Sequence, residues 1–404
     1  MNRRLKHFED YRGIADDAVL EEIIEKAKAI QGATVAHVNA TSYGGGVAEI
    51  LDSFVLLMND LGIRTDWRVL HGIPDFFEVT KKFHNALQGQ ELSFSEEELD
   101  LYKFINEKFA RFAFLDHDFV IIHDPQPCAL VRHIPHTSPW VWRCHIDITK
   151  PDAQAWAFME PYIIEYDRMI VSSEIYKVPA LAIEQDIISP SIDPLSPKNM
   201  DLPDQVIDDY LTKYQIPTDK PIITQVSRFD PWKDPEGVLK VFERVKEQID
   251  CRLMFVYNMA SDDPEGVKIL AKMTEVAKDF LDQGDVLFVC GDDPILVNVL
   301  QRISDVVIQK STREGFGLVI TEAMWKGTPV VASNVGGIPT QMVDGVTGYL
   351  LEPYDYDGFA EKILALLEDK SLAQELGRQA KEHVRGHFLI TRHLLDYIDL
   401  ILSL

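Results

Sequence analysis

The sequence STREGFGLVITEAMWKGTPVVASNVGG, residues 311–337, combines a glycine turn, a helical pattern and an apolar strand pattern. It predicts a loop, a helix that begins near Gly317 and a buried parallel strand over residues 329–332. Glu314 would lie at the amino end of this helix, where free backbone N–H groups can hold hydroxyl or phosphate oxygens. Glu322, about a turn and a half further on, could face the same cleft. The arrangement favours a nucleotide-sugar site, although a helix-end carboxylate and a solvated glutamate would also fit it.

Length and composition indicate a globular protein with more than one domain. The chain has 404 residues, of which 46% are hydrophobic and 26% are charged, and this length predicts two or three domains. It has no apolar run of about 18 residues, and no apolar segment follows its first basic residues. We therefore expect no membrane span, no signal peptide and a cytoplasmic location. The formal net charge of −25 would repel nucleic acid and anionic membranes, so neither is expected as a partner.

The four cysteines are scattered along the chain, a distribution that predicts reduced core thiols and no disulfide framework. Two of them share a short segment with three histidines, and all five side chains are potential metal ligands. Their spacing matches no tight zinc pattern, so we expect no metal site there. The five residues are Cys128, His133, His136, Cys144 and His145.

Strands and helices alternate in the amino-terminal half. A short apolar strand over residues 33–40 leads into Gly44, Gly45 and Gly46, and a helix is predicted over residues 47–61. Glycines let the backbone approach a ligand closely, although three glycines can also form just a tight turn. Further strands are expected over residues 65–70, 119–122, 140–146, 168–172 and 180–184, with helices over residues 16–30, 75–87 and 95–112.

Polar side chains lie at the ends of two of these strands. Asp124 and Gln126 follow one strand, and His145 and Asp147 end the next. Ligands bind at the carboxyl ends of parallel strands, so the four side chains together predict a shared site. A helix cap or a buried core histidine would explain any one of them alone.

A proline-rich segment over residues 189–203 predicts a linker. The alternation of strands and helices resumes after it, so the fold class is α/β, with two doubly wound Rossmann-like domains facing a cleft. We expect the domains to cover residues 1–195 and 196–387, with a final helix at about 388–404 packing back on the first domain.

Two cations follow the first strand of the second half, which is predicted over residues 221–226. Arg228 and Lys233 lie between this strand and a helix that begins near Asp234. Arginine offers forked contacts and lysine a mobile point charge, so the pair could clamp a diphosphate, although a solvated charged turn is the simpler alternative. Further strands are expected over residues 252–257, 286–289, 306–308, 330–332 and 349–351, with helices over residues 354–367, 372–387 and 391–402.

Four ordered motifs in this half resemble the retaining glycosyltransferases of family four, which have the B-type glycosyltransferase fold of two Rossmann-like domains. They are SRFDPWKDPEGVL, REGFGLVITEAMWKGTPVVAS, NVGGIP and DGVTGYLL. In the amino-terminal half, HVNATSYGGGVAEIL, HDPQP and WRCHID resemble the trehalose-forming branch, closest to the archaeal-type trehalose glycosyltransferring synthases. The resemblance implies a retaining hexosyltransferase that joins glucose from ADP-, UDP- or GDP-glucose to free glucose, in a reaction that could be reversible.

The resemblance also implies residue roles. Arg228 and Lys233 would bind the diphosphate and stabilise the charge of the leaving group. Glu314 would hold hydroxyls of the donor hexose, and Glu322 would bind the ribose. His145 would reach the donor sugar and complete the catalytic set with Arg228, Lys233 and Glu314. The glycine loop Gly44, Gly45 and Gly46 would close over the phosphates and acceptor, backbone N–H groups of Gly315, Phe316 and Gly317 would assist Glu314, and the acceptor candidates are Asp124, Gln126 and Asp147.

One departure from the family pattern is Lys310, which lies where many relatives have a proline and is expected to be an exposed loop lysine. Retention by front-face attack, with the leaving phosphate taking the acceptor's proton, is favoured because the sequence offers no clear carboxylate nucleophile. No tightly bound cofactor is expected, magnesium could act as a stimulant, and a homodimer is possible. The alternatives are a trehalose phosphorylase, which would have no ribose for Glu322 to bind, and a sugar-nucleotide sensor without turnover.

Overall fold

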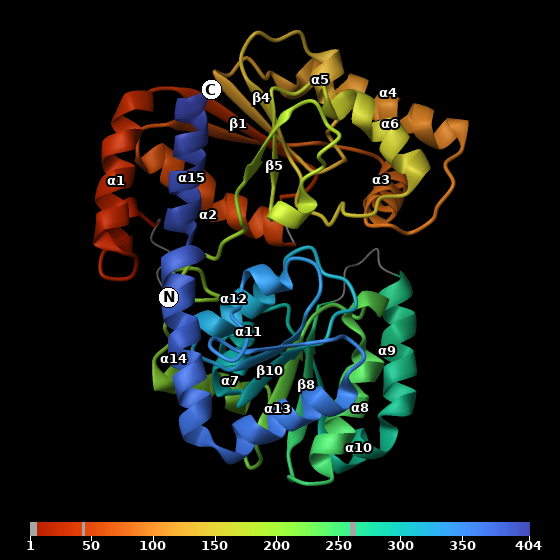
Figure 1. Cartoon of the computed structure of the whole chain (residues 1–404), viewed down its shortest axis with the longest axis vertical. Helices are drawn as coiled ribbons and strands as arrows, with labels where there is room; N and C mark the ends of the chain where they lie inside the picture. The colour runs from red at the N-terminus through yellow and green to blue at the C-terminus, as the bar shows by residue number, and fades with distance from the viewer. Residues whose placement is uncertain (1–5, 43–44, 259–263) are drawn as a thin grey trace. The chain divides into compact units, whose positions relative to one another are not determined.

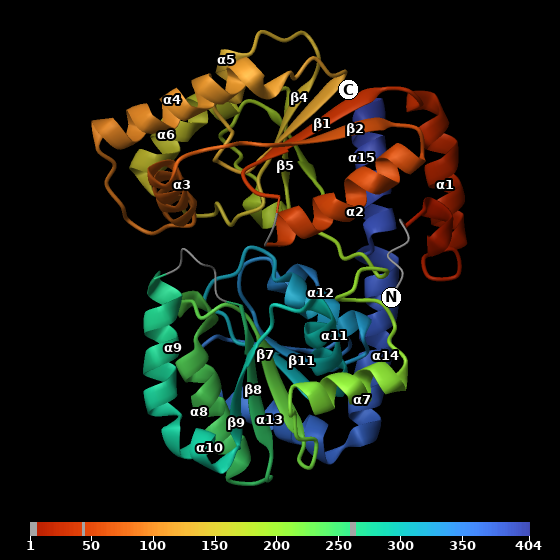
Figure 2. The ribbon, with the colours of Figure 1, turned by 180° about the vertical axis from the view of Figure 1, so that it is seen from behind.

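The computed structural model describes residues 6–42, 45–258 and 264–404. The chain divides into two compact units, one formed by Met1–Ser191 with Ile390–Leu404 and the other by Ile192–Leu389. Each unit contains a six-stranded parallel sheet with helices between the strands (Figures 1 and 2). The predicted α/β class with two doubly wound domains is therefore confirmed. No helix in the described part of the chain is long and apolar enough to cross a membrane.

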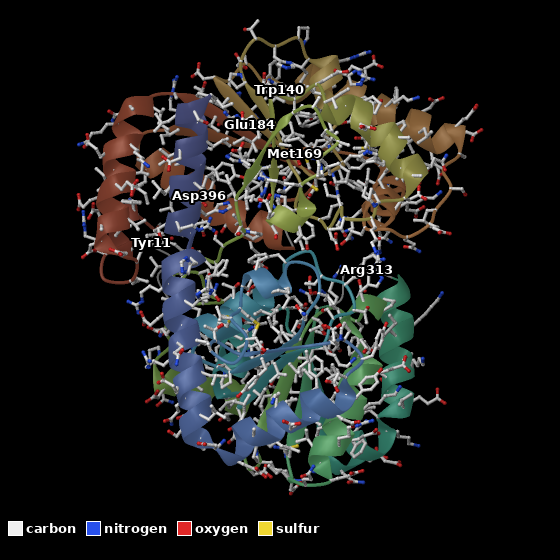
Figure 3. All side chains as sticks on the ribbon, viewed as in Figure 1. Tyr11, Trp140, Met169, Glu184, Arg313 and Asp396 are labelled. Carbon is white, nitrogen blue, oxygen red and sulfur yellow. The ribbon has the colours of Figure 1, made fainter. Side chains whose placement is uncertain are left out.

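The sheet of the first unit has the strand order β2-β1-β3-β4-β5-β6. The strands are β1 (Thr34–Asn39), β2 (Arg64–Val69), β3 (Phe119–His123), β4 (Trp140–Arg143), β5 (Arg168–Val171) and β6 (Glu184–Ile187). The helices are α1 (Asp17–Ala27), α2 (Gly46–Asp60), α3 (Pro74–Leu87), α4 (Glu96–Ala113), α5 (Leu130–His133), α6 (Ala153–Ile163) and α15 (Ile390–Ser403). Figure 3 labels Trp140 on β4 and Met169 on β5, and both side chains are fully buried in the core of this unit.

The last helix, α15, packs against α1 and α2 within the first unit, as both ribbon views show (Figures 1 and 2). Lys26 Nζ lies 2.7 Å from Asp399 Oδ1 and ties α15 to α1. On α15 itself, Arg392 pairs with Asp396, which Figure 3 labels, and Arg392 Nη2 donates to the backbone oxygen of Ser189 (2.8 Å).

The sheet of the second unit has the strand order β12-β11-β10-β7-β8-β9. The strands are β7 (Ile222–Val226), β8 (Arg252–Tyr257), β9 (Val286–Cys290), β10 (Val306–Gln309), β11 (Val330–Ser333) and β12 (Tyr349–Leu351). The helices are α7 (Asp204–Lys213), α8 (Pro235–Lys246), α9 (Pro264–Val276), α10 (Lys278–Gln283), α11 (Pro294–Ile303), α12 (Leu318–Trp325), α13 (Tyr356–Glu368) and α14 (Lys370–His387).

Two predicted segments differ from the structure. The strand expected over residues 180–184 is wrong, because β6 begins at Glu184 and lies at the edge of its sheet, where Arg168 pairs with Glu184 (3.1 Å) and Asp186 (3.3 Å). The strand expected over residues 140–146 ends at Arg143.

The segment after Ser191 is packed on the second unit, so the predicted linker over residues 189–203 is not a free connection. Asn298 Nδ2 on α11 donates to the backbone oxygens of Pro197 (3.0 Å) and Met200 (2.8 Å). Trp325 Nε1 on α12 donates to the backbone oxygen of Asn199 (3.1 Å). The prolines here shape an ordered chain that is held by side-chain donors.

Candidate functional site

The loop between β10 and α12 places Glu314 and the glycine turn at the carboxyl end of the second sheet. Gly317 is the residue before α12 and has a φ of 87°, in the left-handed region that favours glycine. The amide of Gly337 donates to the backbone oxygen of Glu314 (3.2 Å). A Cβ on Gly337 would lie 2.3 Å from the backbone oxygen of Gly315, so only glycine allows the two loops to meet this closely. Arg313, labelled in Figure 3, comes from the same loop.

Lys233 and Glu314 form an ion pair at the ends of neighbouring strands. Lys233 ends a 3₁₀ turn, Pro231–Lys233, that follows β7, and its Nζ donates to Glu314 Oε2. The same carboxylate oxygen accepts from Ser311 Oγ (3.2 Å) and Gln309 Nε2 (3.3 Å). The amide of Thr312 donates to the backbone oxygen of Trp232 (2.7 Å), so the two loops are also joined through the backbone. The structure thus brings together two of the predicted site residues, with the cation held by a carboxylate.

Arg228 lies at the end of the same strand but in a more open environment. Its side chain is 53% exposed, whereas the side chain of Lys233 is 18% exposed. Arg228 Nη2 lies 3.7 Å from Asp230 Oδ2, and Asp230 Oδ1 accepts from the amide of Trp232 (2.8 Å). The two predicted clamp cations therefore share a strand end but have separate carboxylate partners.

Glu322 is buried on α12 and has its own set of partners. Its side chain is 3% exposed; Oε1 lies 3.4 Å from Lys198 Nζ, and Oε2 accepts from Gln301 Nε2 (3.5 Å). Lys326 Nζ donates to the backbone oxygen of Glu322 (3.1 Å), and desolvation lowers the pKa of Lys326 to about 7. Glu322 thus contacts Lys198, Gln301 and Lys326, whereas Glu314 contacts other side chains.

Lys310 is fully buried, and the expectation of an exposed loop lysine is wrong. Its Nζ pairs with Asp234 and lies 4.4 Å from the ring centre of Tyr356 on α13. Desolvation is the main cause of its lowered pKa. Asp234 has a φ of 45°, and its Oδ1 accepts from the amide of Gly237 (3.0 Å), which caps α8. Through its pair with Asp234, Lys310 fixes the start of α8, and Asp234 directly follows Lys233 in the sequence. Lys310 is buried because aromatic rings of α13 cover it.

In the first unit, Asp124 and His145 meet at the carboxyl ends of β3 and β4. The amide of His145 donates to Asp124 Oδ1 (2.8 Å), and Asp124 has a left-handed backbone with a φ of 63°. Trp142 Nε1 donates to the backbone oxygen of Asp124 (3.0 Å). Burial raises the pKa of Asp124 to about 6.

His145 is the last of three linked imidazoles, which we call the histidine chain: His37, His123 and His145. His123 Nδ1 lies 2.9 Å from His145 Nε2, and His123 Nε2 lies 2.9 Å from His37 Nδ1. Desolvation lowers the pKa of His37 to about 3 and holds the pKa values of His123 and His145 well below the usual range. Arg143, also fully buried, lowers the latter two further. All three rings are therefore neutral.

The other predicted residues of this unit have local structural contacts. Asp147 Oδ1 accepts from the amide (2.9 Å) and Oγ1 (2.6 Å) of Thr149, which closes a turn. The backbone oxygen of Gln126 accepts from Asn106 Nδ2 (3.1 Å). Gly45 precedes α2 with a φ of 84°, and Gly46 is the first residue of that helix. Gly44 lies outside the described residues.

The cysteine and histidine segment forms core packing. Cys128 and Cys144 are buried free thiols, and the ring of His136 stacks on Trp140 at 4.5 Å. Within residues 6–42, 45–258 and 264–404, no group of three or more His, Cys, Asp or Glu side chains could hold a metal ion.

Sequence reasoning missed several partners of the predicted residues. His37 and His123 lie on β1 and β3, inside segments that were quoted for other reasons, and a histidine at or near the ends of three adjacent strands is a signal that could have identified them. Gln309 and Lys198 carry no such signal, because their contacts with Glu314 and Glu322 depend on how the loops fold.

Comparisons with known proteins cover both halves of the chain. The family model described as "Trehalose synthase, N-terminal domain" matches residues 37–178, and "Glycosyl transferases group 1" matches residues 206–383. The chain is 47% identical to a trehalose synthase of Thermococcus litoralis, over 98% of this chain and 97% of that protein. It is 45% identical to a trehalose synthase of Pyrococcus horikoshii, over 99% and 97% respectively.

Solved structures show the same fold at low sequence identity. A trehalose-6-phosphate synthase superposes with a TM-score of 0.75 at 14% identity, covering 92% of this chain and 99% of that one. Sucrose-phosphate synthase from Thermosynechococcus elongatus gives a TM-score of 0.72 at 18% identity, covering 92% and 98%. The predicted B-type glycosyltransferase fold is confirmed. The matches at high identity along nearly the whole sequence establish that the chain belongs to the trehalose synthase family of glycosyltransferases.

Proposed function

We propose that this chain is a retaining glucosyltransferase that makes trehalose from a nucleoside diphosphate glucose and free glucose, in a reaction that can run in both directions. The observation that carries the proposal is the full-length similarity to trehalose synthases. The donor is ADP-, UDP- or GDP-glucose. The site geometry supplies chemistry suited to such a donor in the second unit.

Lys233 and Arg228 are proposed to bind the diphosphate and to stabilise the charge that develops on the leaving group. The ion pair with a carboxylate in a partly buried site holds the Lys233 ammonium in place before the donor binds. Stabilisation of transition-state charge by a group held in this way is usually the largest single effect on turnover. Glu314 would hold hexose hydroxyls, supported by Ser311 Oγ and by backbone groups of Gly315, Phe316 and Gly317.

Glu322 is proposed to bind the ribose hydroxyls. Its carboxylate is already buried, and its charge is balanced by Lys198 at 3.4 Å. Because a charged acceptor gives strong hydrogen bonds to hydroxyl donors, it would contribute to nucleotide affinity. A phosphate-using enzyme would have no ribose at this position.

His145 is proposed to contact the donor sugar, with Asp124, Gln126 and Asp147 as acceptor candidates. Retention is proposed to follow front-face attack, in which the leaving phosphate takes the proton of the acceptor hydroxyl. Double displacement would instead need a carboxylate nucleophile close to the anomeric carbon. Trapping a glucosyl ester on any carboxylate of the unmodified enzyme would contradict this step.

A thermal-shift experiment separates this function from a trehalose phosphorylase. Three trehalose phosphorylases match at 24–28% identity, and this chain spans 54–59% of their lengths. UDP or ADP should raise the melting temperature because the ligand binds only the folded state, and phosphate with glucose should have little effect. The reverse pattern would favour the phosphorylase. Nucleotide binding without release of UDP from UDP-glucose, whatever the sugar acceptor, would favour a sensor.

The remaining proposals concern conditions and assembly. We propose that no cofactor is tightly bound, that magnesium acts at most as a stimulant, that the chain forms a homodimer and that it works in the cytoplasm. Activity after treatment with a chelator tests the role of magnesium, and light scattering tests the dimer.

A further inference from the structure

The histidine chain runs across three neighbouring strands of the first sheet. His37 lies on β1, His123 ends β3, and His145 lies just after β4. His37 is 0% exposed and His123 is 2% exposed, whereas His145 is partly exposed. The histidine chain thus connects the buried interior of the first unit to His145, which the proposed function places against the donor sugar.

Two hydrogen bonds between three neutral imidazoles allow two proton arrangements. In the first, His37 Nδ1–H donates to His123 Nε2, and His123 Nδ1–H donates to His145 Nε2. His145 then carries its own proton on Nδ1. In the second, every bond is reversed, so that His145 is protonated on Nε2 and His37 carries a proton on its own Nε2.

The interior end of the chain distinguishes the two arrangements. His37 Nε2 is buried and has no hydrogen-bond partner among the described residues. The neighbours of the His37 ring are aromatic: the ring centres of Phe54 and Tyr397 lie 5.3 Å and 5.9 Å from the centre of the imidazole. The second arrangement would leave an N–H donor orphaned there, which is rare in folded proteins, whereas an unpaired acceptor is tolerated more often. The first arrangement is therefore favoured.

Burial, together with the charged and titratable groups around it, keeps the histidine chain neutral. Arg143 ends β4, and Arg392, His393 and Tyr397 come from α15, which packs within the same unit. The carboxylate of Asp124 accepts a hydrogen bond from the backbone N–H of His145. Desolvation, the largest effect, and the nearby cation Arg143 both oppose a protonated imidazole at His123 and His145. A charged ring, which would donate from both nitrogens, is thus disfavoured as the resting state.

We propose that His37 and His123 are positioning residues that hold His145 as the tautomer protonated on Nδ1. The Nδ1–H of His145 then donates a hydrogen bond to a group that binds beside it, and His145 presents no basic nitrogen to that group. The contact with a sugar rests on the proposed function, whereas the tautomer does not. This assignment also fits front-face transfer, in which His145 need not accept the proton of the acceptor.

The tautomer can be measured directly in the full-length protein without substrate. Nitrogen-15 NMR of histidine-labelled protein distinguishes protonated from unprotonated ring nitrogens, and the His145→Gln variant assigns the signals of that ring. We expect His145 to be protonated on Nδ1 and unprotonated on Nε2. Protonation on Nε2 would overturn the proposal, even if the enzyme makes trehalose.

Matched variants of His37 test the positioning role. In His37→Asn the amide can still donate to His123 Nε2, whereas the leucine of His37→Leu is similar in size and has no donor. We expect both tautomers of His145 to be populated in His37→Leu. The kcat should fall roughly 10- to 100-fold with the KM for the donor nearly unchanged, since a misoriented His145 loses contacts that are made mainly in the transition state. His37→Asn should restore the tautomer and most of kcat.

If His37→Leu is folded by circular dichroism and keeps both the Nδ1 tautomer and the kcat of the unmodified enzyme, His37 has no positioning role. If His37→Leu does not fold, the tautomer of the unmodified protein still decides the proposal. If the protein makes no trehalose from any donor, the proposed function fails, while the tautomer measurement remains valid.

Discussion

Lys233 Nζ donates a hydrogen bond to Glu314 Oε2, although the two residues are 81 positions apart in the sequence. Lys233 follows β7 and Glu314 follows β10, and these strands are neighbours in the second sheet. The contact joins the cationic segment and the glutamate segment, the two parts of the sequence that first indicated a donor site.

Lys233→Ala should lower turnover about 100- to 1,000-fold, because the variant loses a charge that stabilises the leaving group in the transition state. The fold should persist, since Glu314 keeps its contacts with Ser311 and Gln309. Steady-state kinetics and a thermal melt measure the two effects.

Lys82→Ala is a matched control for this variant. Lys82 also pairs with a glutamate, Glu98, at 2.7 Å, and it lies in the first unit on α3. Its removal should leave kcat within about twofold. A change of less than about twofold in Lys233→Ala would place Lys233 outside the diphosphate clamp.

Glu322→Gln should weaken nucleotide binding about tenfold or more and leave the KM for glucose nearly unchanged, because a charged acceptor for hydroxyl donors is lost. Isothermal titration with UDP and ADP measures the nucleotide affinity. Glu98→Gln, which removes a lysine-paired carboxylate of the first unit, is the control. An unchanged nucleotide affinity would remove the ribose role and favour the phosphorylase.

Lys310→Ala should reduce the free energy of unfolding by about 3 kcal/mol, because it leaves the carboxylate of Asp234 without its buried cation. Urea denaturation followed by circular dichroism measures this change. Lys240→Ala is the control, since Lys240 also lies over the ring of Tyr356, at 5.6 Å, but is exposed. Equal stability of the two variants would show that the Lys310 pair does not hold the start of α8.

Burial of His37 makes stability dependent on pH on the acid side. Its pKa is about 3 in the folded protein and near 6.5 when exposed, so between these values the unfolded chain binds a proton that the folded chain does not. Stability is therefore lost as the pH falls through this window. In His37→Asn the decline should be shallower by up to about 1.4 kcal/mol per pH unit. Urea denaturation at several pH values below 7 measures the slope, and identical slopes would contradict the burial of a neutral ring.

The fold could be predicted well because the strands of both sheets are buried apolar runs bounded by turns. β7 and β8, for example, lie within a residue of their predicted bounds. The edge strand β6 was harder, since it carries Glu184 and Asp186, which pair with Arg168, and thus lacks the apolar pattern of a core strand.

The site could be predicted in part, because motif spacing identifies residue types at strand ends but not their partners. Glu314 and Lys233 were expected to share a site, and their direct contact follows from the order of strands β10 and β7. The burial of Lys310 depends on α13, which is separated from Lys310 in the sequence by strands β11 and β12. The residues next to Lys310 therefore do not indicate that it is buried.

The most direct test of the proposed function is product analysis by NMR. Purified protein is mixed with glucose and, in separate reactions, with ADP-, UDP- and GDP-glucose, so that one spectrum reports the donor used, the linkage and the anomeric configuration. We expect trehalose with both anomeric centres in the α configuration and release of the nucleoside diphosphate. A different linkage, an inverted anomeric centre or no product from any of the three donors would contradict it.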